Sequence, residues 1–107
     1  MVEVVWAGEA FRCLDEIEDF IAQDSPENAI RFSEYLLDRA ESLLDNPQLG
    51  RIVPEFLHPD IREIIAKGYR IVYRIREQRI EILSVFEGHR LLDSASLGID
   101  FIDPPED

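Results

Sequence analysis

The stretch from Asp60 to Arg90, DIREIIAKGYRIVYRIREQRIEILSVFEGHR, contains three short runs in which apolar and polar residues alternate. Breaks at Lys67-Gly68 and Glu77-Gln78 separate the runs. Alternation with a period of two is typical of strands that bury one face. One face of the central run comprises Tyr69, Ile71, Tyr73 and Ile75. The other face comprises Arg70, Val72, Arg74 and Arg76. The pattern therefore predicts an antiparallel meander with an apolar face and an arginine-rich face.

The arginine-rich face has two interpretations. Antiparallel sheets often leave one charged face in water, and these arginines would then pair with Glu63, Glu81 and Glu87 on neighbouring strands. Alternatively, an open sheet face that gathers arginine is a docking surface for an anionic partner, because the guanidinium fork pairs well with carboxylates.

Two amphipathic helices are predicted before the meander. Val2–Trp6 reads as a short strand, and Phe11, Leu14, Ile17 and Ile21 then recur at helical spacing up to about Gln23. Ser25-Pro26-Glu27 is a strong start signal for a second helix, with Ser25 as N-cap and proline at the first helical position. The expected buried face of the second helix comprises Ala29, Phe32, Ser33, Leu36, Leu37, Ala40, Leu43 and Leu44. The short link between the helices predicts an antiparallel hairpin, and Asn46-Pro47 should end it.

The rest of the chain adds few chemical signals. Pro54 argues against a central strand near residues 51–55, and His58 reads as a loop residue. One cysteine, Cys13, excludes an internal disulfide and fits a cytoplasmic setting. The sequence shows no membrane span and no motif for a metal or a cofactor, so none is expected. We expect one α+β domain over residues 1–107, with a core at about 2–92 and an acidic tail at 93–107.

Charge is distributed unevenly along the chain. The formal net charge is −12, with −9 in residues 1–50, +2 in residues 51–90 and −5 in residues 91–107. Positive charge is thus concentrated in the predicted sheet. Because binding to nucleic acid depends on neutralising phosphate with Lys and Arg, direct binding to free nucleic acid is not expected of so anionic a chain.

The order of these elements and residues resembles the RelE/ParE superfamily of toxins from type II toxin–antitoxin modules, over about residues 4–92. The pieces that carry the resemblance are Trp6-Ala7, Leu14-x-x-Ile17, Asp24-Ser25-Pro26, Gly50-Arg51-x-Val53-Pro54-Glu55, Ile61-Arg62-Glu63, Tyr69–Arg74, Ile82-Leu83-x-Val85 and Gly88-His89-Arg90. The GR-x-VPE and IRE pieces are typical of the ParE branch. The resemblance implies a β-α-α-β-β-β fold with the helix hairpin packed on a mostly antiparallel sheet.

The resemblance also implies a function and a partner. ParE-like members are associated with poisoning of DNA gyrase, RelE-like members cleave messenger RNA on the ribosome, and both are held inactive by a cognate antitoxin in a hetero-oligomeric complex. Three alternatives stay open: a ParE-like gyrase inhibitor, which the residues favour; a RelE-like ribonuclease; and a non-toxic homologue that only binds an antitoxin.

Candidate site residues follow from the same resemblance. Arg70 and Arg90 match nuclease arginines, and His89 is a candidate acid or base because the pKa of histidine lies near neutrality. Other nuclease positions are not kept, since Ile61 and Glu63 stand where basic residues are expected and Ser96 stands where a tyrosine is expected. For antitoxin binding we predict the sheet face that carries Arg62, Arg70, Arg74 and Arg90, with the adjoining groove along the helices.

Overall fold

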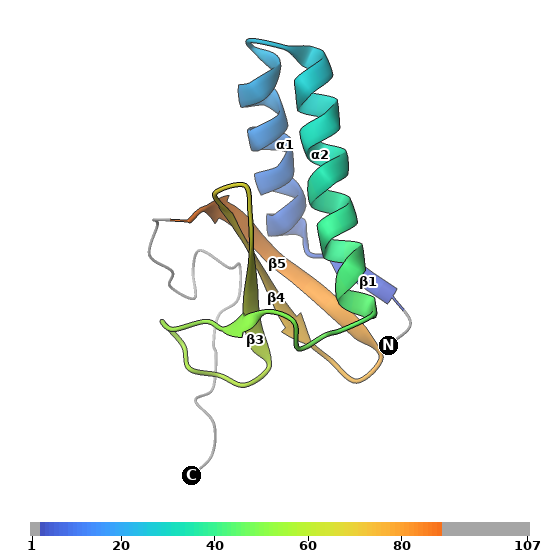
Figure 1. Ribbon diagram of the computed structural model, residues 1–107, viewed down its shortest axis with the longest axis vertical. Helices are drawn as coiled ribbons and strands as arrows, with labels where there is room; N and C mark the ends of the chain where they lie inside the picture. The colour runs from blue at the N-terminus through green and yellow to red at the C-terminus, as the bar shows by residue number, and fades with distance from the viewer. Residues whose placement is uncertain (1–2, 89–107) are drawn as a thin grey trace.

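The computed structural model describes residues 3–88, which form a helix hairpin packed against a five-stranded sheet (Figure 1). The elements in chain order are β1 (Glu3–Trp6), α1 (Gly8–Ala22), α2 (Pro26–Glu41), a 3₁₀ turn η1 (Ser42–Leu44), β2 (Arg51–Ile52), β3 (Ile61–Ala66), β4 (Tyr69–Ile75) and β5 (Arg79–Glu87). The predicted α+β architecture is confirmed. No helix among residues 3–88 is long and apolar enough to cross a membrane.

Cap residues at 25 and 26 determine where the second helix of the hairpin begins. Ser25 has an extended backbone, and its hydroxyl accepts a hydrogen bond from the Asn28 N–H at 3.2 Å. Pro26 follows at the first helical position, as predicted. The two helices run antiparallel, and the Ser33 hydroxyl donates to Glu18 on α1 at 2.6 Å. The turn between the helices projects beyond the sheet (Figure 1).

The strand order in the sheet is β1-β5-β4-β3-β2. β3, β4 and β5 form the predicted antiparallel meander, whereas β1 pairs in parallel with β5, Val4 lying opposite Ile80. β2 is a two-residue edge strand on β3, which fits the presence of Pro54 just after it. A register shift between Val72 and Tyr73 adds one residue to β5 relative to β4.

The main core lies between the helices and the sheet. Ile71, Tyr73, Ile80 and Ile82 are fully buried there, and Ile75 packs at the margin, so the predicted inward face of the meander is confirmed. Their partners on the helical side include Ala10, Cys13, Leu14, Leu36, Ala40 and Leu43.

The buried faces predicted for the two helices point toward the sheet as expected, but the predicted faces include residues that the structure exposes. Phe11 is 51% exposed and Leu37 is 40% exposed, although both were expected to be buried. Phe11 instead lies beside the Trp6 ring, with centroids 6.0 Å apart. The small residues Ala10 and Ala40 are completely buried, which shows that the helices pack closely along a narrow stripe.

A second apolar cluster covers the opposite face of the sheet. It comprises Val53, Ile61, Val72, Leu83 and Phe86, with Phe56 packed against it. Val53 and Phe56 come from the irregular segment 53–57, whose turn is closed by the Leu57 N–H donating to the Val53 carbonyl at 2.9 Å. The expectation that this face is open was therefore wrong at its centre, because a loop covers it.

Candidate functional site

Arg70 lies under the 53–57 segment rather than in solvent, with 4% of its surface exposed. Two of its nitrogens donate to the two carboxylate oxygens of Glu55, each at 2.9 Å, and Nε donates to Glu63 at 2.6 Å. The guanidinium carbon also lies 5.3 Å from the centre of the Phe86 ring. This planar fork between two carboxylates is the geometry in which a buried arginine is tolerated.

Glu63 is the centre of this ion-pair cluster. Its side chain is completely buried, and it accepts from Arg51 as well as from Arg70. The cluster of Arg51, Glu55, Glu63 and Arg70 therefore joins β2, β3, β4 and the 53–57 segment. The hydrogen bonds that Arg70 donates to Glu55, and then those to Glu63, raise the pKa of Arg70 against the opposing effect of burial. Arg70 is thus permanently charged, and its charge is directed inward.

The other two arginines in the described part of the predicted binding face do not join Arg70. Arg62 is the cross-strand neighbour of Tyr73, and it donates to the backbone carbonyls of Gly50 and Pro59 at 3.0 and 3.1 Å. Arg74 pairs with Glu81 at 3.0 Å. Burial alone would raise the pKa of Glu81, but hydrogen bonds from Arg74 and Arg79 outweigh it and lower that pKa.

The predicted single arginine surface is therefore not what the structure shows. Arg62 lies on the same side of the sheet as Tyr73, whereas Arg70 and Arg74 lie on the other side. The alternative pairing with glutamates is confirmed for Arg70 with Glu63 and for Arg74 with Glu81. His89 and Arg90, the two other candidates, lie outside the described residues. Whether any of these residues contacts an antitoxin stays a prediction.

Gly50 allows the segment before β2 to pass very close to β3 and β4. A Cβ at this position would lie 2.5 Å from the Glu63 carbonyl oxygen and 2.7 Å from the Tyr73 hydroxyl. The Gly50 N–H instead donates to the Tyr73 hydroxyl at 2.9 Å, and that hydroxyl donates to the Pro47 carbonyl at 2.7 Å. The Gly50-Arg51 pair thus has a structural role. The glycine allows the backbone to approach β3 closely, and Arg51 forms an ion pair with Glu63.

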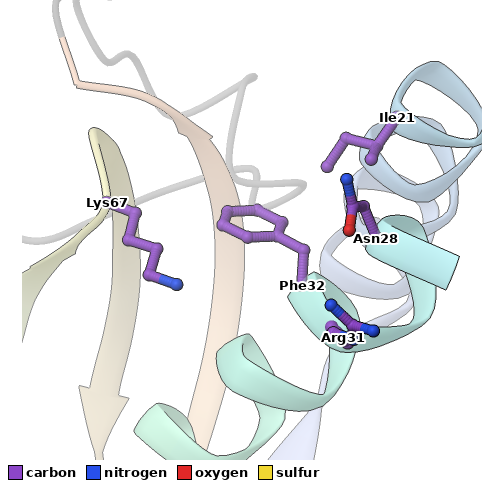
Figure 2. Close-up of a pocket in the computed structure, with 5 residues that line it drawn as sticks. All are labelled: Ile21, Asn28, Arg31, Phe32 and Lys67. Carbon is purple, nitrogen blue, oxygen red and sulfur yellow. The ribbon is translucent and has the colours of Figure 1, made fainter. Parts of the chain in front are cut away.

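A pocket that sequence reasoning missed lies between the helix hairpin and the β3–β4 turn. It encloses about 360 Å³ and is lined by Ile21, Asn28, Arg31, Phe32 and Lys67 (Figure 2). Lys67 and Gly68 both have positive φ, +51° and +86°, as a tight two-residue hairpin turn requires. The turn places the Lys67 ammonium 4.3 Å from the centre of the Tyr35 ring. The pocket is therefore apolar at Ile21 and Phe32 and cationic at Arg31 and Lys67.

The sequence signal for this pocket was weak. Lys67-Gly68 was predicted correctly as a break between strands, and Phe32 was assigned to the buried face of its helix. Nothing in the spacing brings residue 67 against residues 28–32, because that contact depends on how the hairpin crosses the sheet.

Comparison with known proteins agrees with this architecture. Residues 4–92 match the family described as the ParE toxin of the type II toxin–antitoxin system parDE. Toxin RelE2 of Caulobacter vibrioides is 33% identical over 92 residues, which is 85% of this chain and 100% of that protein. A chain from the chromosomal ParDE toxin–antitoxin system of P. aeruginosa has the same fold, with a TM-score of 0.68 at 21% identity, covering 81% of this chain and 96% of the other.

The family match covers both helices, the ion-pair cluster and the five strands except for Glu3, the first residue of β1. The chain therefore belongs to the ParE toxin family of type II toxin–antitoxin systems, and an antitoxin is its expected partner.

Proposed function

We propose that this toxin acts in the cytoplasm by binding DNA gyrase, and that it does not hydrolyse a phosphodiester bond itself. The observation that carries this proposal is the burial of Arg70 between Glu55 and Glu63. Arg70 is the residue that matches a nuclease arginine. A guanidinium that is 4% exposed and forked onto a carboxylate is not available to a phosphate group.

Charge supports the same proposal. The formal net charge is −12, and the described arginines of the sheet hold carboxylates or backbone carbonyls. Long-range repulsion from RNA would oppose association, since attraction to phosphate depends on Lys and Arg that are open to the solvent. A protein target makes no such demand.

The second candidate is a ribosome-dependent ribonuclease, which the name of the Caulobacter relative, Toxin RelE2, favours. That activity would need a phosphate-binding group other than Arg70. His89 and Arg90, the remaining candidates, follow β5 in the sequence after Gly88.

A paired assay with purified protein separates the two candidates. We expect the toxin to inhibit gyrase supercoiling in a dose-dependent way and to leave ribosome-bound messenger RNA intact. Cleaved messenger RNA with unaffected gyrase would refute the proposal in favour of the ribonuclease. No effect in either assay, together with normal growth when the toxin is expressed alone, would identify a non-toxic antitoxin-binding homologue.

We further propose that the antitoxin forms a hetero-oligomeric complex with the toxin. A neutralising segment that orders on docking needs apolar surface to offset its loss of entropy. The helix hairpin offers such surface, since Phe20 and Ile30 are 69% and 55% exposed near its projecting end.

A further inference from the structure

The pocket beside the β3–β4 turn is lined by two cations, although the helix layer next to it is acidic overall. Residues 1–50 carry 12 acidic and 3 basic side chains, yet Arg31 from α2 and Lys67 from the turn both line this pocket. Figure 2 shows Lys67 on one side of the Phe32 ring and Ile21, Asn28 and Arg31 on the other side. An occupant that combines carboxylates with apolar side chains would match both parts of this lining.

The described chain ends beside the same pocket. Glu87, at the end of β5, is paired with Tyr69, and the Gly88 N–H donates to the Gly68 carbonyl at 2.8 Å. Gly68 is the immediate neighbour of Lys67. The Tyr69 ring in turn lies 5.4 Å from the Phe32 ring of the pocket, measured between centroids. Everything after Gly88 therefore starts at the pocket's edge.

The sequence that follows has the matching chemistry. Residues 93–107, DSASLGIDFIDPPED, carry five acidic and no basic side chains, together with Leu97, Ile99, Phe101 and Ile102. The family match ends at residue 92, and the Caulobacter relative is covered completely by 92 aligned residues. The tail therefore lies outside the stretch of the chain that matches the family model.

The tail is also long enough. An extended chain spans up to about 3.3–3.6 Å per residue, so the nine residues from Gly88 to Leu97 reach about 30 Å. The pocket lies at the starting point, well within this reach.

We propose that residues 93–107 dock in cis in the pocket formed by Ile21, Asn28, Arg31, Phe32 and Lys67. The Leu97–Ile102 segment places apolar side chains against Phe32 and Ile21, and its acids face Lys67 and Arg31. Docking covers the junction between the helix hairpin and the sheet, and a partner that uses this surface has to displace the tail.

Paramagnetic labelling of the full-length protein tests the proposal. A spin label is attached at Ser96→Cys in a Cys13→Ala background, and amide signals are compared with the label oxidised and reduced. We expect signal loss at Asn28, Arg31, Phe32 and Lys67, and none at the β4–β5 turn. The loss should diminish at about 1 M salt, where the screening length is about 3 Å.

Two charge variants provide the matched comparison. Arg31→Glu combined with Lys67→Glu should abolish the signal loss at the pocket, whereas Arg76→Glu, an exposed cation in the β4–β5 turn, should preserve it. Signal loss elsewhere, or at the pocket in the double variant as well, would overturn the proposal. Signal loss in a mixture of isotope-labelled protein and separately spin-labelled protein would show that the tail of a second copy fills the pocket, which also contradicts docking in cis.

Discussion

At the scale of single residues, the central finding is that Arg70 has a structural role: it stabilises the fold. Glu63 is a completely buried carboxylate, and its charge is balanced by Arg70 from β4 and Arg51 from β2. Among residues 3–88, no buried side-chain nitrogen or oxygen lacks a hydrogen-bond partner. Removing one member of such a network leaves an uncompensated charge in the interior, which is more damaging than losing an exposed pair.

Arg70→Ala should therefore lower the free energy of unfolding by about 3–5 kcal/mol, since Glu63 and Glu55 lose their shared partner. The matched control is Arg74→Ala, on the same strand and the same face, whose pair with the less buried Glu81 should contribute about 0–1 kcal/mol. Urea unfolding monitored by circular dichroism measures both. Equal effects of the two substitutions would show that the Arg70 cluster contributes no more than a surface ion pair.

At the scale of elements, local sequence was sufficient wherever the deciding contacts are local. The start of α2 at Pro26, the break at Lys67-Gly68 and the inward face of β4 were all predicted from residues within a few positions of each other. The second apolar cluster was not predicted, because Val53 and Phe56 lie in an irregular segment with no periodicity. The parallel pairing of β1 with β5 was not predicted for a similar reason: about seventy-five residues separate the two strands.

The cap of α2 gives the prediction at this scale. Ser25→Ala should lower the free energy of unfolding by about 0.5–2 kcal/mol, because the Asn28 N–H loses its acceptor. Ser25→Thr, which keeps a hydroxyl, should lose less. Thermal unfolding measures both variants, and an unchanged melting temperature for Ser25→Ala would mean that the observed hydrogen bond does not stabilise the helix.

At the scale of the whole molecule, the sequence indicated the family and the charge distribution, but not where the charges point. Eight basic side chains lie within residues 51–90, and that concentration suggested one cationic face. Folding divides them instead: Arg62 and Arg70 lie on opposite sides of the sheet, and Lys67 lies beside the helix hairpin. The pairing of Arg70 with Glu55 could not be predicted from the sequence, because it depends on a loop that crosses the sheet.

We expect Arg70 to contribute to toxin activity only through its role in folding. The most direct test is the activity of Arg70→Ala per folded molecule, at a low temperature where circular dichroism shows a large folded fraction. We expect the proposed inhibition of gyrase by this variant, divided by the folded fraction, to equal that of the unsubstituted toxin. A folded Arg70→Ala protein that has lost its activity, and above all one that has lost cleavage of ribosome-bound messenger RNA, would contradict it.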